Sequence, residues 1–219
     1  TPAVRIVNPG QAPATVSVTM LGKDGARPLA GAQSVAIDAG SVFDISLAGV
    51  PAGVYGVQVT SNTPVGAAVR LVRSAGEYPE RSQALIHDQA WAQAALPGAA
   101  DSGLLAVPRA SSLTSAVTVA NSGAATSVTL SSVDGSWSQD VAVAKGSAVV
   151  VEVPTEVAAV RLSAAGQESA SGTSRTPSGL AAATIVTAQA GGDLTGTLIS
   201  TVPAQPDASV RAQRSILLG

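Results

Sequence analysis

Few side chains in this sequence have the chemistry of a catalytic site. His87 is the only histidine among 219 residues, and there is no cysteine. A histidine-centred triad needs an orienting acid and a nucleophile that converge on the ring. Asp88 is only the chain neighbour of His87, and adjacent side chains of a strand point to opposite faces. We therefore expect His87 to be a surface residue, and we expect no catalytic residue.

The acidic residues form no recognisable ligand set. The 14 aspartates and glutamates are dispersed, without the closely spaced carboxylates of a calcium loop. Zinc favours clustered Cys and His ligands, and no glycine-rich phosphate loop follows a strand. Asp24 and Asp134 each precede a glycine, which predicts two turns. We expect no metal, no cofactor and no enzymatic activity; two carboxylates that meet from distant strands are the enzymatic alternative.

The aromatic side chains are the best candidates for binding a ligand, because ring faces can stack on the C–H groups of sugars. Phe43 alternates with core positions and is expected to be buried. Tyr55 follows a Pro-Gly corner, where its hydroxyl is expected to bond to nearby backbone. Trp137, Trp91 and Tyr78 are the candidate contacts with a ligand or partner. Structural packing is the alternative interpretation of each tryptophan.

The segment "RLVRSAGEYPER" groups basic and acidic side chains. Arg70, Arg73 and Arg81 lie in it, together with Glu77 and Glu80. A solvated loop with salt bridges is the simpler interpretation, and such exposed pairs contribute little to stability. The alternative is a docking patch near a domain junction, with Arg73 as a contact.

Several phrases occur twice and in the same order. Asn8-Pro9-Gly10 is repeated as Asn121-Ser122-Gly123, and the Asp-Gly turn at Asp24 is repeated at Asp134. The longest pair is "QSVAIDAGSVFDISL" (33–47) with "QDVAVAKGSAVVVEV" (139–153). A shared order with drifting offset indicates duplication with loop trimming. The sequence therefore predicts a first β-sandwich over 1–100 and a second, with a C-terminal strand, over 101–219.

Apolar side chains alternate with polar ones along both predicted units. Val16, Val18 and Met20 in the first unit, and Val149 and Val151 in the second, show this two-residue period of a half-buried strand. The pattern predicts an all-β fold of two tandem immunoglobulin-like or fibronectin-like β-sandwiches.

The structure or role of three segments is less clearly indicated by the sequence pattern. The segment 82–98 has helix-forming residues, but its cognate 182–192 is β-branched and Gly-rich, which favours a strand and loop. Residues 96–103 are the linker candidate. The tail near 209–217 is expected to supply an edge strand to one unit.

Charge and composition restrict the class of partner. The formal net charge of −2 and the pI near 5.3 give no electrostatic basis for binding nucleic acid or an anionic membrane. No apolar run approaches the roughly 18 residues that span a bilayer, so we expect membrane contact only through an anchor or export signal outside these residues. The absence of cysteine suits a protein outside the cytoplasm. Small side chains dominate the outward faces, which are expected to be smooth and mildly apolar. Sandwich edges that expose unpaired backbone can accept a strand from a partner.

Five phrases of the chain carry a family resemblance: "VNPG", "ATVSVTMLGKDG", "AGSVFDISLAGVPAGVYGVQV", "AWAQAA" and "LLAVP". Together they resemble an uncharacterised family of secreted or membrane-anchored actinobacterial proteins. The resemblance covers roughly Val4 to Pro203, and the second unit lacks the "PAGVYGV" corner and the tryptophan of "AWAQAA". It implies tandem β-sandwiches at the cell envelope and transfers no functional residue. We therefore expect a non-enzymatic spacer, scaffold or protein-interaction module of the envelope. A glycan-binding module is the alternative.

Overall fold

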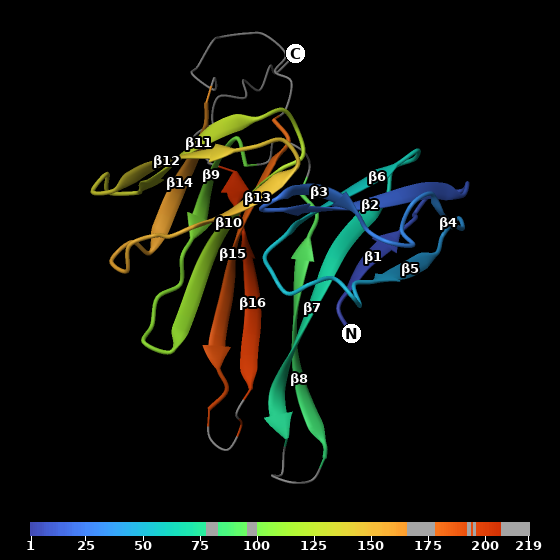
Figure 1. The fold of residues 1–219 in the computed structure, drawn as a ribbon, viewed down its shortest axis with the longest axis horizontal. Helices are drawn as coiled ribbons and strands as arrows, with labels where there is room; N and C mark the ends of the chain where they lie inside the picture. The colour runs from blue at the N-terminus through green and yellow to red at the C-terminus, as the bar shows by residue number, and fades with distance from the viewer. Residues whose placement is uncertain (78–82, 96–99, 166–177, 192–193, 195, 207–219) are drawn as a thin grey trace, which may run out of the picture.

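The computed structural model describes residues 1–77, 83–95, 100–165, 178–191, 194 and 196–206. These residues form seventeen strands and no helix, which confirms the predicted all-β fold (Figure 1). The strands of the N-terminal part are β1 (Ala3–Val7), β2 (Ala14–Gly22), β3 (Gly25–Pro28), β4 (Val35–Ile37), β5 (Val42–Ser46), β6 (Gly56–Ser61), β7 (Gly66–Glu77) and β8 (Leu85–Gln93). Those of the C-terminal part are β9 (Ser102–Ala106), β10 (Leu113–Asn121), β11 (Thr126–Ser132), β12 (Ser138–Val143), β13 (Ser147–Val151), β14 (Ala159–Ala164), β15 (Leu180–Gln189), β16 (Thr197–Pro203) and β17 (Gln205–Pro206).

The strands form four antiparallel sheets, and the two halves of the chain share one strand order. Sheet A has the order β5-β1-β7-β8, and sheet D has the order β13-β10-β15-β16. In sheet B, β2 pairs with β3, β4 and β6. Sheet C has the order β12-β11-β14-β9-β17, so β11 pairs with β12 and β14. Seven strands of the first half therefore have counterparts in the second half. They are the pairs β1 and β10, β2 and β11, β4 and β12, β5 and β13, β6 and β14, β7 and β15, and β8 and β16.

The repeat extends to individual hydrogen bonds. Asn8 and Asn121 are both fully buried. Asn8 Nδ2 donates to the carbonyl oxygen of Ile37 at 3.1 Å, and Asn121 Nδ2 donates to that of Val143, also at 3.1 Å. The Oδ1 atom of each asparagine accepts from the backbone N–H two residues later, at 3.0 and 2.8 Å. Each asparagine thus ties the start of its unit to the end of β4 or β12.

The Asp-Gly turns lie where the sequence predicts them. Gly25, the first residue of β3, has φ +105°, and Gly135 has φ +77° between β11 and β12, values that glycine adopts without steric cost. Asp134 Oδ1 accepts from the Ser136 backbone N at 3.0 Å and from its hydroxyl at 2.8 Å. Hydrogen bonds from the Ser132 hydroxyl and from Ser136 lower the pKa of Asp134 to about 2.

Two separate aliphatic cores lie between the sheets. In β2, alternate side chains at Ala14, Val16 and Val18 are fully buried, as the two-residue period requires. The core of the first half consists of Val4, Ile6, Ala14, Val16, Val18, Met20, Leu29, Ala32, Ile37 and Ile45. The core of the second half consists of Ala100, Leu105, Val107, Val117, Val119, Val128, Leu130, Val143, Val151, Val157, Val160, Leu162, Ala164 and Leu180. Each half is thus a pair of sheets around its own core, consistent with a β-sandwich.

Small residues bring the two halves close together. Leu21 of β2 forms a third buried cluster with Ala120 of β10 and Ala148 of β13. Gly56 lies so close to Ala120 that a Cβ on Gly56 would overlap the Cβ of Ala120. Elsewhere the Ile199 N–H of β16 donates to Asp88 Oδ2 of β8 at 2.6 Å.

The structure confirms two local predictions, for β8 and Tyr55, and contradicts a third, for Phe43. Within 82–98, β8 is a strand, as favoured, and Tyr55 donates its hydroxyl to the Pro51 carbonyl oxygen at 3.2 Å, as expected. The prediction that Phe43 is buried is wrong. Phe43 is 44% exposed because β5 is the outermost strand of sheet A.

The linker and tail predictions fall partly on undescribed residues. Residues 96–99 lie outside the described residues, but Ala100 belongs to the second core and β9 begins at Ser102, so the end of the predicted linker is part of that half. The tail at 209–217 also lies outside the described residues. Just before it, β17 pairs with β9. The described part of the chain has no helix that could span a membrane.

Candidate binding surface

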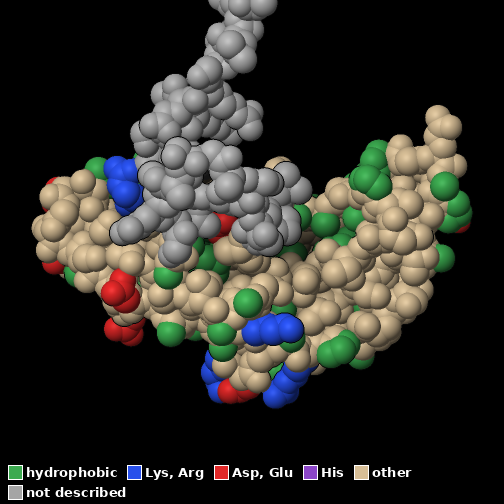
Figure 2. Space-filling view, turned by 90° about the horizontal axis from the view of Figure 1, so that it is seen from above, with side chains coloured by type: hydrophobic (Ala, Val, Ile, Leu, Met, Phe, Trp, Pro, Cys, Tyr) green, Lys and Arg blue, Asp and Glu red, His purple; other side chains and the backbone are tan. Residues whose placement is uncertain are grey.

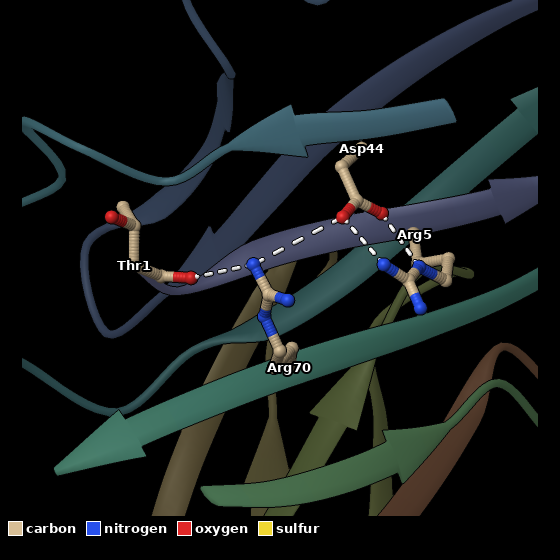
Figure 3. A network of polar contacts seen from close by, with 4 residues as sticks. All are labelled: Thr1, Arg5, Asp44 and Arg70. Atoms are coloured by element: carbon tan, nitrogen blue, oxygen red, sulfur yellow. Dashed lines mark hydrogen bonds and ion pairs between the residues drawn. The ribbon is translucent and has the colours of Figure 1, made fainter. Parts of the chain in front are cut away.

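The outer face of sheet A carries a paired arginine and aspartate. β1 and β5 run antiparallel in a register that places Arg5 directly opposite Asp44. Arg5 Nε donates to Asp44 Oδ1 at 2.7 Å and Arg5 Nη2 donates to Oδ2 at 2.8 Å (Figure 3). This two-point hydrogen bond from Arg5 lowers the pKa of Asp44 and raises that of Arg5.

Arg70 of β7 joins the pair from the next strand. Its Nη2 donates to the Thr1 carbonyl oxygen at 3.0 Å and lies 3.9 Å from Asp44 Oδ2 (Figure 3). Its Nε is buried and has no hydrogen-bond partner among the described residues. Two guanidinium groups and one carboxylate leave this cluster with a net positive charge on a chain whose formal net charge is −2.

Trp91 lies across the strand pair from Arg70. The β7–β8 register makes Arg70 and Trp91 directly opposed. The guanidinium carbons of Arg5 and Arg70 are 5.0 and 5.8 Å from the centroid of the Trp91 ring, within the range of a cation–π interaction. Trp91 is nevertheless 37% exposed. The ring is therefore oriented by the two arginines and still accessible.

A shallow, open hollow of about 470 Å³ adjoins this cluster. The small residues Gly66, Ala67 and Ala68 of β7 are part of its lining. Arg5, Val7, Trp91, Gln93 and Ala94 complete its lining.

An exposed apolar pair borders the hollow. Val7 is 39% exposed, and Val42, its neighbour in the β1–β5 register, is 57% exposed. We call the set Arg5, Val7, Val42, Asp44, Arg70, Trp91 and Gln93 the outer-face patch.

The face shown in Figure 2 carries few charged side chains. Most of it is backbone and uncharged side chains, and several of the charged groups lie together at the lower edge of this view. Among the described residues, no three His, Cys, Asp or Glu side chains lie close enough to hold a metal ion. His87 lies on β8 and is exposed, as expected.

The structure does not bring together the three predicted contact residues that it describes, Trp91, Trp137 and Arg73. Trp91 belongs to the outer-face patch, whereas Trp137 is partly buried against the second core, with its backbone N bonded to the Ser132 hydroxyl at 2.9 Å. Arg73 is exposed on β7 but is three residues from Arg70, so its side chain points to the other face of the strand. Tyr78 lies outside the described residues.

The loop interpretation of the arginine-rich segment is wrong for its described part. Arg70, Arg73 and Glu77 lie in β7, a strand of twelve residues. Glu80 and Arg81 lie outside the described residues. The predicted alternation missed this strand because small residues and arginines interrupt its apolar positions.

Sequence reasoning also missed Arg5, Val7 and Asp44 as site residues. The sequence indicated only that these residues lie at outward positions of alternating strands. Many solvent-exposed residues without a function lie at such positions. Their proximity depends on the β1–β5 register, which joins residues 39 positions apart in the chain.

Comparison with known proteins finds one family. A family model described as "Family of unknown function (DUF5719)" matches residues 1–154, which includes the whole outer-face patch. No curated protein matches the chain. No solved structure matches it either.

Proposed function

The chain belongs to DUF5719, a family of unknown function, and we propose that it acts outside the cytoplasm as a non-enzymatic scaffold or protein-interaction module of an actinobacterial cell envelope. The observation that carries the proposal is the outer-face patch. Trp91, Val7 and Val42 remain exposed there beside an ordered cluster of charges. Exposed apolar groups bordered by polar groups are characteristic of protein-interaction sites.

The junction between the halves supports the scaffold role. Leu21, Ala120 and Ala148 exclude solvent between the units, and Gly56 permits close approach. Burial of these side chains favours one fixed relative orientation, because close-packed protein interiors resist deformation. A rigid two-unit body suits a protein that holds a partner at a defined distance.

Site-specific photocrosslinking in whole cells tests both parts of the proposal. A photoreactive residue at Gln93, which lines the hollow, is expected to give discrete adducts. The same residue at Val133, which is 57% exposed at the β11–β12 turn, is the matched control and is expected to give none. Protease added to intact cells is expected to degrade the protein.

Two results would contradict the proposal separately. Resistance to protease in intact cells, with digestion after lysis, excludes an extracytoplasmic location. Equal crosslinking from Gln93 and Val133 excludes the outer-face patch as the interaction site.

A glycan partner is the second candidate, and the exposure of Trp91 beside the hollow favours it. The Trp91 ring is 37% exposed and has the guanidinium groups of Arg5 and Arg70 over it, so its accessible part can stack on a sugar ring while the arginines donate to the sugar hydroxyl groups. The variant Trp137→Phe leaves Trp91 as the single tryptophan, so its fluorescence reports on the patch alone. Saturable quenching by purified envelope polysaccharide supports this candidate, and an unchanged spectrum excludes it.

A further inference from the structure

The two halves differ at one equivalent edge. In the second half, the register pair Ala120–Ala148 is covered by Leu21 and is only 8% and 3% exposed. The equivalent pair in the first half is Val7–Val42, at 39% and 57% exposed. The repeat thus uses this position as a contact surface in one half and leaves it open in the other. Figure 1 shows β5 at the end of the molecule remote from β9–β16.

The backbone of β5 has an unused hydrogen-bonding side. Leu47 N donates to the Pro2 carbonyl oxygen at 3.1 Å, and the Ser41 carbonyl oxygen accepts from Asn8 N at 3.0 Å. Odd-numbered residues of this segment therefore direct their backbone groups toward β1. In an antiparallel pair the direction alternates, so Val42 and Asp44 direct theirs away from the sheet. No described strand pairs with that side of β5.

Apolar side chains flank this open edge on both faces. Phe43 is opposite Ile6 on the core side and is 44% exposed, while Val42 is 57% exposed on the outer face. An exposed strand edge with large apolar side chains is a template for pairing with another strand. Phe43 is the only phenylalanine of the chain, and it lies at this edge.

We propose that β5 pairs antiparallel with β5 of a second copy of this chain, around a two-fold axis at Phe43. In this register the backbone of Val42 in each copy bonds to the backbone of Asp44 in the other. The two Phe43 rings face one another as a non-hydrogen-bonded pair, where side chains approach most closely. The contact is isologous, which is the commonest symmetry of homodimers.

The register centred on Phe43 makes the strand complementary to itself without opposing like charges. Centring the axis on Asp44 would place two carboxylates directly opposite each other, which is destabilising. Centring it on Phe43 places each Asp44 opposite Val42 and leaves its pairing with Arg5 intact. Because β5 has only five residues, the dimer is expected to be reversible and dependent on concentration.

Sedimentation of the full chain over a concentration series tests the proposal. We expect a monomer–dimer equilibrium that Phe43→Lys abolishes, because two ammonium groups would meet at the axis. Val150→Lys is the matched control: Val150 is 48% exposed on β13, the counterpart of β5, and its substitution is expected to leave the equilibrium unchanged. A monomer at all concentrations, or a dimer insensitive to Phe43→Lys, overturns the proposal.

Oxidative crosslinking provides a second measurement that does not depend on the lysine variants. The chain has no cysteine, so any disulfide in Phe43→Cys joins two copies. Opposed non-hydrogen-bonded residues have Cβ atoms about 4.5 Å apart, close to disulfide geometry. We expect rapid dimer formation by Phe43→Cys and little by Val150→Cys; equal rates contradict the proposal. A negative result leaves the proposed function in place, because crosslinking at Gln93 requires no second copy.

Discussion

Asn8 and Asn121 occupy the same position in the two halves of the chain and make the same buried hydrogen bonds. Each donates 3.1 Å to the carbonyl oxygen that ends the equivalent strand, at Ile37 in one half and Val143 in the other. Each also accepts from the backbone N–H two residues later. The shared asparagines therefore explain why the Asn-x-Gly phrase occurs twice: each closes one unit.

Replacing either asparagine with alanine is expected to destabilise its own half. Asn8→Ala leaves the buried Ile37 carbonyl without this donor, and an unsatisfied buried group costs about 1–3 kcal/mol. Chemical denaturation monitored by circular dichroism measures the loss. Gln11→Ala, an exposed change in the same turn, is the control and is expected to have little effect. Equal stability of Asn8→Ala and Gln11→Ala would contradict a structural role for the asparagine.

Much of the fold could be predicted because its signals are local. The two-residue period at Val16 and Val18 identified a strand face, and the Asp-Gly turns at Gly25 and Gly135 were found from residue type alone. Phe43 shows the limit of this information. Its alternation with Ile45 gave the correct face of the strand, but exposure depends on which strand is outermost in the sheet.

The candidate surface could not be predicted because it depends on register between distant segments. Arg5 and Asp44 meet across β1 and β5, and Arg70 meets Trp91 across β7 and β8. A shift of one residue in either pairing would send each side chain to the opposite face. Trp91 was identified from its residue type, but its two arginine neighbours required the sheet.

The ion pair of the outer-face patch is expected to orient side chains rather than stabilise the fold. The Arg5 and Asp44 side chains are 39% and 33% exposed. Exposed pairs of this kind contribute little to stability. A double-mutant cycle of Arg5→Ala and Asp44→Ala, measured by urea denaturation at low and high salt, is expected to give a small coupling that falls with salt. A larger coupling, insensitive to salt, would show that the pair is effectively buried.

Asp134 is expected to make stability depend on pH at the acidic end. Its pKa in the folded chain is about 2, below the ordinary 3.8, because Ser132 and Ser136 donate to its carboxylate. A depressed pKa contributes stability that is present above 3.8 and is lost as the pH falls toward 2.

Two measurements check the assignment of this pH dependence. Carboxyl NMR titration should give a midpoint near 2 for Asp134. Asp134→Asn should lower the unfolding temperature at neutral pH and have a progressively smaller effect as acid is added. A midpoint at the ordinary value would show that the serine hydroxyls do not bond to the charged form.

Steric fit at the junction can be tested with a pair of glycines. A Cβ on Gly56 would overlap Ala120, whereas a Cβ on Gly66 would lie 3.7 Å from the Val7 Cβ, an ordinary contact. Gly56→Ala is therefore expected to destabilise the chain by about 1–3 kcal/mol through overpacking, while Gly66→Ala has little steric cost. Thermal unfolding measures both.

The compensating change identifies the contact responsible. Adding Ala120→Gly to Gly56→Ala transfers one methyl group across the junction, so it restores the space without changing the total volume. We expect the double variant to recover most of the stability lost by Gly56→Ala, because residues in contact show strong non-additivity. If the two substitutions are simply additive, then Gly56 and Ala120 are not packed against one another, and the two halves are not held in the fixed orientation that a scaffold requires.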